Sequence, residues 1–156
     1  MNRMRGVVVA LVALGGMGLH GASAEGMRLP RIEHAVTLKE CGACHMVYSP
    51  QMLPQRSWQA IMSSLESHFG ENANLDEAMK QDVLSYLLAN AADAPGQKGY
   101  LGLLRGVTSD AVPNRITEMP WFGGSHGEAS FGKRKASNCI ACHVGADKSM
   151  VYAEPD

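Results

Sequence analysis

The chain of 156 residues has few of the features that define common function classes. It contains only four cysteines, three phenylalanines and two tryptophans, and its formal net charge at pH 7 is −1. No basic stripe is long enough to indicate nucleic-acid binding. After residue 24 there is no apolar segment of about 20 residues, the length that a membrane-spanning helix needs. No alternation of apolar and polar residues indicates strands, which favours a mainly α fold.

The first 24 residues have the pattern of a secretory signal peptide. Two arginines precede an apolar run from residue 6 to residue 19, and A-S-A at residues 22–24 is a small-residue cleavage site. The apolar run is too short to span a bilayer. We therefore expect cleavage after Ala24 and a periplasmic mature domain of residues 25–156. That mature chain is expected to have no membrane span and to be a monomer.

All four cysteines lie in two motifs of the form C-x-x-C-H, which read CGACH at residues 41–45 and CIACH at residues 139–143. This pattern matches the attachment site of a c-type haem. Cysteines at i and i+3 lie on one face of a helical turn, so both sulfurs can reach the vinyl groups of one porphyrin. The histidine that follows can bind the iron as the proximal ligand. The sequence therefore predicts two covalent haem c groups, with thioethers at Cys41, Cys44, Cys139 and Cys142 and proximal ligands at His45 and His143.

The alternatives explain less of this pattern. A four-sulfur zinc site usually separates its two C-x-x-C pairs by about 15–20 residues, far fewer than here, and needs no trailing histidines. In an oxidising compartment the cysteines could form two disulfides. One pair alone could be a thioredoxin-like redox motif. None of these accounts for two C-x-x-C-H motifs.

Helical periodicity predicts two helices after the first motif. Ser57 is the candidate N-cap of the first, which carries apolar residues at steps of three and four as far as Gly70. His68 falls on that apolar stripe. Asn74 is the candidate cap of the second helix, which should run to about Asn90.

The rest of the chain is irregular in composition. Residues 92–132 are rich in glycine and proline and predict a long loop segment with one short helix around residues 100–105. Ser137 is a candidate cap for a last helix that carries the second motif. The expected architecture is a small, mainly α single domain built around two haems. Aromatic residues that could pack on the haem rings, or simply form core, are Tyr48, Trp58, Tyr100, Trp121 and Phe122.

The sixth ligand of each iron decides the chemistry, because methionine raises a haem potential and a second histidine lowers it. An open position would let small molecules bind. His68 and His126, the latter in the glycine-rich stretch WFGGSHGE, are the leading candidates. His34, in a polar stretch before the first motif, and Met119, which precedes a proline as in mono-haem cytochromes c, are alternatives.

These residues resemble the small dihaem cytochromes c of bacteria. The likeness covers residues 40–75, then RITEMPWF at residues 115–122, His126 and SNCIACH, and it is weak between residues 92 and 114. The resemblance implies a periplasmic electron carrier with two low-potential haems, each held by two histidines. It makes His68 and His126 the distal ligands, which we pair with the first and second haem respectively. In some members the redox partners are a membrane b-type cytochrome and a small mono-haem cytochrome, and the resemblance implies such partners here.

The expected function is therefore a one-electron shuttle rather than an enzyme. The rival hypotheses are a haem enzyme and a gas-binding or sensor cytochrome, both of which need one open iron site. Two charged features could serve the shuttle. Lys133, Arg134 and Lys135 could dock an acidic partner or simply be solvated, and Arg56 could pair with a haem propionate.

Overall fold

The computed structural model describes residues 26–127 and 131–153. The predicted signal peptide lies outside these residues, so its cleavage stays a prediction. The described helices are α1 (Ala35–Cys41), α2 (Gln55–Ser63), α3 (Glu77–Asn90), α4 (Pro120–Ser125) and α5 (Ala146–Ser149), and the strands are β1 (Met27–Arg28) and β2 (Val151–Tyr152). Shorter 3₁₀ segments lie at Pro50–Met52, Leu65–Ser67, Lys98–Leu104, Ile116–Glu118 and Cys139–Ala141. The predicted mainly α fold is confirmed.

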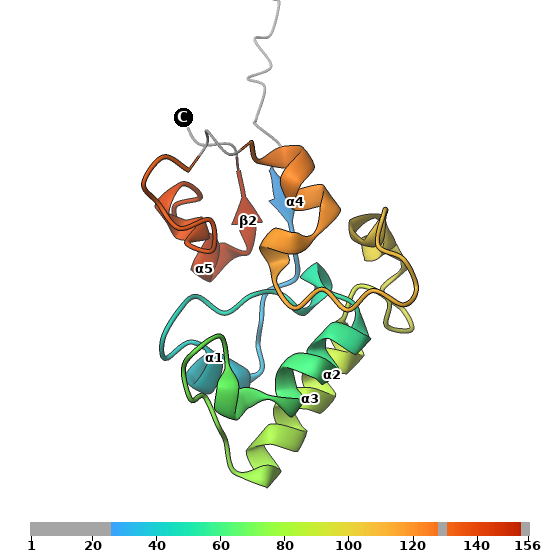
Figure 1. Ribbon diagram of the computed structural model, residues 1–156, viewed down its shortest axis with the longest axis vertical. Coiled ribbons are helices and arrows are strands. Elements are labelled where there is room, and N and C mark those ends of the chain that lie inside the picture. The colour runs from blue at the N-terminus through green and yellow to red at the C-terminus, as the bar shows by residue number, and fades with distance from the viewer. Residues whose placement is uncertain (1–25, 128–130, 154–156) are drawn as a thin grey trace, which may run out of the picture.

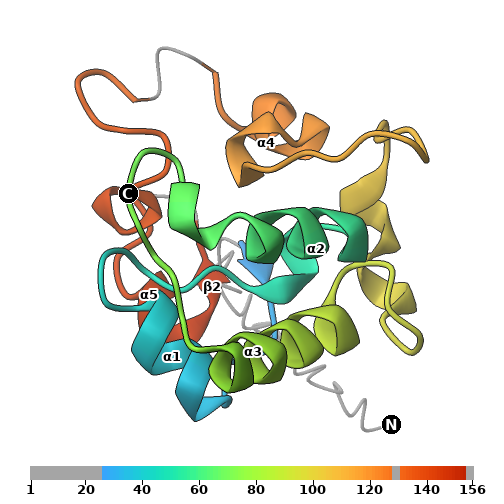
Figure 2. The same ribbon diagram turned by 60° about the horizontal axis from the view of Figure 1, so that its bottom comes forward.

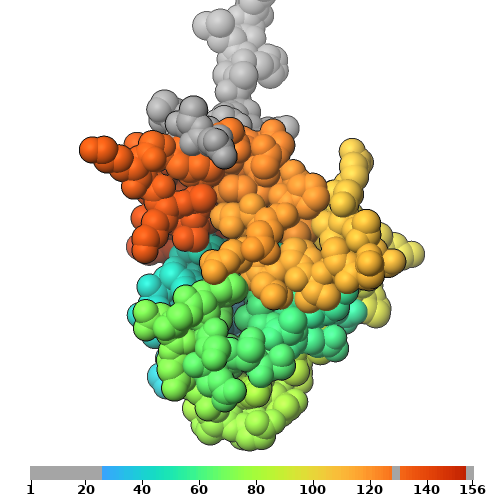
Figure 3. Space-filling view, in the orientation of Figure 1, coloured from blue at the N-terminus to red at the C-terminus, as the bar shows by residue number. Residues whose placement is uncertain are grey.

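The two halves of the sequence occupy opposite ends of the molecule. Helices α1, α2 and α3 lie at the bottom of Figure 1, and α4, α5 and β2 lie at the top. The space-filling view shows the same separation on one face, with green residues below and orange to red residues above (Figure 3). Strand β1 crosses from the first half to pair antiparallel with β2, so that Met27 faces Tyr152. This short pairing brings residues 27–28 together with residues 151–152.

Helix α2 differs from its predicted bounds. It begins at Gln55 after Pro54, and Ser57 is buried inside it instead of capping it. It ends at Ser63, so His68 does not lie on its apolar face and that expectation was wrong. A 3₁₀ turn follows the helix, and Phe69 then has a positive φ of 52°, which redirects the chain immediately after His68.

Helix α3 ends at Asn90 as predicted but begins later than expected. Its cap is Asp76, whose carboxylate accepts a hydrogen bond from the Met79 amide at 2.9 Å, and the prediction of Asn74 was wrong. A carboxylate at this position satisfies a free amide and also suits the positive end of the helix dipole. Helix α3 packs along α2, as Figure 2 shows from below.

The glycine- and proline-rich segment contains more helix than its composition indicates. The Lys98–Leu104 turn agrees with the predicted short helix. Helix α4 was not predicted, and it begins with Pro120 at its first position, where a missing amide proton costs nothing. The predicted last helix from Ser137 was wrong, because the second motif forms only a 3₁₀ turn preceded by Asn138.

One continuous core joins the two halves. In the first half it includes Leu53 and Val83, which are 1% and 0% exposed. In the second half it includes Met119 and Met150, which are 1% and 2% exposed. All four belong to the same cluster of buried side chains, so the described residues form a single domain. Among them, no helix has the length and apolar character needed to cross a membrane.

Candidate dihaem site

The first motif starts on the last turn of α1 and continues into a tight turn. Cys41 is the final residue of α1, and Cys44 and His45 are exposed on the turn that follows. Gly42 is needed at this turn, because a side-chain carbon there would run into the carbonyl group of Leu38. Burial and the nearby carboxylate of Glu40 raise the pKa of the Cys41 thiol.

The second motif lies on the Cys139–Ala141 turn. Cys139 and Cys142 are half-buried, and burial is the main cause that raises the pKa of the Cys139 thiol. All four cysteines are unpaired, so the disulfide alternative has no support in the structure. Within residues 26–127 and 131–153, no three histidine, cysteine or acidic side chains are grouped as a metal-ion site. The structure therefore gives no support to the zinc alternative either.

The histidine of the first motif, His45, faces a second histidine. The ring centroids of His45 and His68 are 6.3 Å apart, and the ring planes differ by 22°. Imidazole nitrogens bind transition metals at about 2 Å, and the ring centroid lies about 1 Å beyond the nitrogen, so two imidazoles on opposite sides of one metal ion have centroids about 6 Å apart. The observed separation fits one iron between the two rings.

The histidine of the second motif, His143, has the same kind of neighbour. The ring centroids of His143 and His126 are 5.9 Å apart, again the separation that one iron would need. Their planes are close to perpendicular, at 85°. The structure therefore brings together four of the predicted site histidines as two pairs, one in each half of the chain.

Hydrogen bonds orient three of these rings. The Nδ1 atom of His45 lies 2.6 Å from the Met46 carbonyl oxygen, and that of His143 lies 2.6 Å from the Ala153 carbonyl oxygen. The Nδ1 atom of His126 lies 3.2 Å from the Phe122 carbonyl oxygen. Because a carbonyl oxygen can only accept, each Nδ1 carries the proton and each Nε2 keeps its lone pair. This is the arrangement typical of histidines that bind a metal.

His126 is held by aromatic rings as well. It follows α4 directly and stacks on Phe122, with centroids 4.3 Å apart and planes within 14°. Phe131 lies nearly parallel to it at 5.8 Å. Phe122 was predicted as a residue that packs at the haem or forms core, and in the structure it is a core residue that also supports this histidine.

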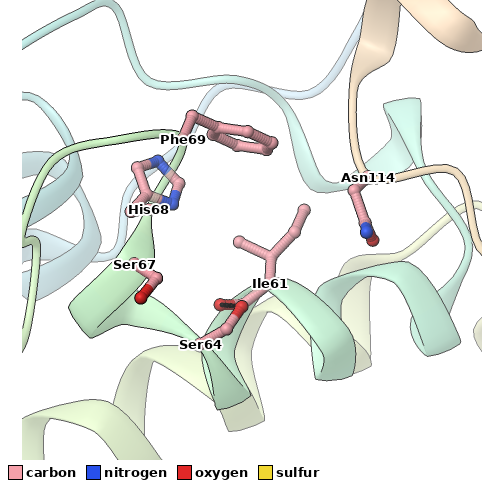
Figure 4. Close-up of a pocket in the computed structure, with 6 residues that line it drawn as sticks. All are labelled: Ile61, Ser64, Ser67, His68, Phe69 and Asn114. Carbon is pink, nitrogen blue, oxygen red and sulfur yellow. Dashed lines mark hydrogen bonds between the residues drawn. The ribbon is translucent and has the colours of Figure 1, made fainter.

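His68 has a more open environment. Phe69 meets it edge to face at 4.8 Å, and the Arg115 guanidinium sits over the Phe69 ring at 3.9 Å from its centroid. Burial, followed by the nearby His45 and Arg115, lowers the pKa of His68. Figure 4 shows His68 and Phe69 at the edge of a small pocket, opposite Asn114.

Tyr48 connects the two attachment motifs. Its ring stacks on His45 at 5.1 Å, and its hydroxyl donates a 2.7 Å hydrogen bond to the carbonyl oxygen of Ser137, two residues before Cys139. Burial raises the pKa of Tyr48 to about 12. The sequence offered Tyr48 only as a candidate for ring packing, because no local pattern indicates a contact between residues so far apart.

The alternative ligands have other roles in the structure. His34 caps α1, with its Nδ1 atom 2.9 Å from the Thr37 hydroxyl and its Nε2 atom 3.4 Å from an Asp82 oxygen. It also stacks on Tyr86 at 4.7 Å. Met119 is 1% exposed and belongs to the core at the start of α4.

The charged candidates differ in their roles. Arg56 donates to the carbonyl oxygens of Ala111 and Thr108, the second at 2.9 Å, and lies 3.7 Å from the Asp93 carboxylate. Arg56 therefore anchors the loop that contains residues 108–111, which is a structural role that we did not predict. The basic segment, Lys133 to Lys135, is exposed, and its Arg134 lies 3.5 Å from the Cys142 sulfur.

This geometry defines a class of protein: a c-type haem protein with two attachment motifs, each of whose histidines faces a second histidine. The family model for dihaem cytochrome c matches residues 37–151, and the chain belongs to that family. It therefore carries two covalently attached haem c groups. The family consists of haem-based electron-transfer proteins.

Solved structures of similar proteins agree with the fold. A diheme cytochrome c from Rhodobacter sphaeroides is 43% identical over 74% of this chain and 94% of its own, with a TM-score of 0.66. A crystal structure of DHC purified from Rhodobacter sphaeroides is 42% identical over 76% of this chain and 96% of its own, with a TM-score of 0.63. A diheme cytochrome from Shewanella baltica OS155 is 29% identical over 81% and 100%, with a TM-score of 0.59. A comparison with curated proteins gave no match.

Proposed function

We propose that the protein is a periplasmic one-electron carrier whose two haems each have two histidine ligands and low potentials. The observation that carries this proposal is the pair of cross-facing histidines in each half of the chain, with centroids at 6.3 and 5.9 Å. Histidine on both sides of an iron lowers its potential relative to methionine. With both positions filled, little has to move when an electron arrives or leaves.

The proposed ligands follow from the two pairs. His45 and His68 hold the first haem, which is attached at Cys41 and Cys44. His143 and His126 hold the second haem, which is attached at Cys139 and Cys142. When bound, each haem supplies an iron that alternates between the ferric and ferrous states. The chain contributes the four imidazoles, and the carbonyl groups of residues 46, 122 and 153 that fix three of them.

In each cycle the carrier takes one electron from a donor and passes it to an acceptor. Electron transfer therefore needs two partner proteins. The charges support different partners at the two ends. Residues 26–97 contain eight acidic and five basic side chains, whereas residues 98–153 contain seven basic and four acidic ones. Complementary charges speed the encounter of redox proteins. We therefore propose that an acidic partner docks near the second haem, at the exposed basic segment of residues 133–135. A small mono-haem cytochrome and a membrane b-type cytochrome are the proposed kinds of partner.

Ligation is tested by near-infrared magnetic circular dichroism and EPR of the oxidised holoprotein. We expect two low-spin irons with histidine on both sides. Because the angle between imidazole planes sets the splitting of the iron π-type d orbitals, planes at 22° and 85° should give two different EPR signals. His68→Ala and His126→Ala should each convert one iron to high spin and raise one potential. A methionine-to-iron band, or a high-spin iron in the unaltered protein, would contradict the proposal.

Docking is tested by reversing the charge of the basic segment. The variant Lys133→Glu with Lys135→Glu should slow electron exchange with an acidic mono-haem cytochrome at low salt, and the difference should shrink as salt is added. Lys98→Glu with Arg105→Glu is the matched control, since it makes the same charge change at two exposed residues elsewhere. Equal slowing by both pairs would indicate a net-charge effect and not a docking site.

A further inference from the structure

The two distal histidines are held very differently. His126 has a hydrogen-bonded Nδ1 atom and lies nearly parallel to the rings of Phe122 and Phe131, at 4.3 and 5.8 Å. It also follows directly from α4, so its backbone is fixed by a helix. To leave its position, this imidazole would have to give up both ring contacts and its hydrogen bond together.

His68 has no comparable support. Within the part of the chain that the structure describes, neither of its ring nitrogens has a hydrogen-bond partner. Its neighbour Phe69 has a φ of 52°, a left-handed backbone conformation that is unfavourable for a residue with a side chain. Phe69 is also 47% exposed, so little packing offsets that cost. The segment around His68 therefore has backbone strain to release when the histidine moves.

A contact from the other half of the chain restrains the Phe69 side chain. Arg115 lies over the Phe69 ring at 3.9 Å from its centroid, a cation–π contact that joins residue 69 to residue 115. Arg115 is also 3.8 Å from the Glu118 carboxylate, although both side chains are about half exposed. The backbone turn around Phe69 is closed by a hydrogen bond from the Glu71 amide to the His68 carbonyl oxygen at 3.1 Å, and the cation–π contact adds a restraint on the Phe69 ring from outside that turn.

A cavity lies beside His68. Its volume is about 40 Å³, and it is lined by Ile61, Ser64, Ser67, His68, Phe69 and Asn114 (Figure 4). A water molecule occupies about 10–15 Å³ on the same measure, so a diatomic molecule fits in this space. The apolar side chains of Ile61 and Phe69 suit a neutral diatomic molecule, and Asn114 supplies a polar edge.

We propose that the first haem site is a binding site for a neutral diatomic ligand of the nitric oxide or carbon monoxide type. The ligand enters beside His68 and takes its place on the iron, while His126 keeps its place at the second haem. No electron is transferred in this exchange: one iron–nitrogen bond breaks, one bond to the diatomic molecule forms, and the imidazole leaves as a neutral base. Arg115 acts through Phe69 as a positioning residue that slows the exchange. This inference rests on the proposed histidine ligation of both irons.

Carbon monoxide binding to the fully reduced holoprotein tests the proposal. We expect one carbon monoxide per protein, bound at a rate that levels off as its concentration rises, because departure of His68 becomes limiting. Arg115→Gln should raise that limiting rate about two- to five-fold, the effect of losing an exposed cation–π contact. Arg115→Lys retains the positive charge and should restore a rate close to that of the unaltered protein.

Two control variants locate the exchange. Glu118→Gln removes the ion pair of Arg115 but leaves its contact with Phe69, and it should leave the rate unchanged. Phe131→Leu removes one ring beside His126 at the second haem and should leave the rate at the first haem unchanged. A rate that responds to Phe131→Leu and not to Arg115→Gln would overturn the assignment, as would no binding in either the unaltered protein or Arg115→Gln. A high-spin iron before carbon monoxide is added would instead refute the histidine ligation on which the inference rests.

Discussion

Replacing Tyr48 by phenylalanine should weaken the connection between the two halves of the protein. The change removes the 2.7 Å hydrogen bond from the Tyr48 hydroxyl to the Ser137 carbonyl oxygen and leaves the ring on His45. A neutral hydrogen bond contributes about 0.5–1.5 kcal/mol to the free energy of unfolding, and the partial exposure of this one favours the lower half of that range. We therefore expect a loss of about 0.5–1 kcal/mol, measured by guanidinium denaturation of the holoprotein at pH 7.

The effect should depend on pH in a defined direction. Burial raises the pKa of Tyr48 in the folded protein to about 12, from an ordinary value of 10. A group whose folded pKa is raised contributes stability that is present below its unfolded pKa and is lost as the pH rises through its folded pKa. The stability advantage of the unaltered protein over Tyr48→Phe should therefore narrow between pH 10 and about pH 12.

Tyr100→Phe is the matched control, because the same hydroxyl is removed from a residue with no hydrogen-bond partner for it among the described residues. It should leave the free energy of unfolding within about 0.5 kcal/mol of the unaltered protein. If Tyr48→Phe were as stable as this control at pH 7, or if its difference from the unaltered protein stayed constant to pH 12, the role assigned to Tyr48 would be wrong.

Three further changes test other parts of the structure. Met119→Leu keeps the volume of a core residue, so we expect a stability loss below about 1.5 kcal/mol and an unchanged haem spectrum; a changed spectrum would make Met119 a ligand. Gly42→Ala forces a side-chain carbon against the Leu38 carbonyl, so the haem content per protein, measured as the pyridine haemochrome, should fall from two toward one. Full haem content in this variant would show that the turn can relax. Asp76→Ala removes the cap of α3 and should lower the free energy of unfolding by about 1 kcal/mol, seen as a lower urea midpoint; Asp76→Asn should retain most of it.

The attachment motifs could be identified from the sequence because their chemistry is local. Two sulfurs and an imidazole must meet one porphyrin, and this requirement fixes their spacing within five residues. The proposed distal histidines were harder to assign, because no local spacing links them to a motif and only the fold brings them opposite His45 and His143. The resemblance and a helical apolar stripe both pointed to His68, and the second of these reasons was wrong: α2 ends at Ser63, and a 3₁₀ turn with Phe69 at positive φ positions His68 instead.

The strands, helix α4 and the helix caps were not predicted correctly, because they depend on contacts between distant residues or on the first residue of a helix. The pairing of β1 with β2 joins residues that are more than 120 positions apart in the sequence, and two-residue strands leave no alternation to detect. Helix α4 is hidden by Gly123 and Gly124, and only Pro120 at its first position signals a helix start. Ser57 and Asn74 were plausible caps, but Pro54 and Asp76 precede the helices that actually form.

The order of the proposed ligands explains why the two halves differ although their motifs match. In the first half the proximal His45 precedes the distal His68, whereas in the second half the distal His126 precedes the proximal His143. A haem held by either pair therefore closes a loop within its own half, and a short loop costs little entropy to close. The halves are then connected by the shared core, the β1–β2 pair, Tyr48 with Ser137, and Phe69 with Arg115. Changes at a distal histidine should consequently alter one haem, whereas changes at Tyr48 should alter the spectra of both, because its ring touches one proximal ligand and its hydroxyl holds the segment that carries the other motif.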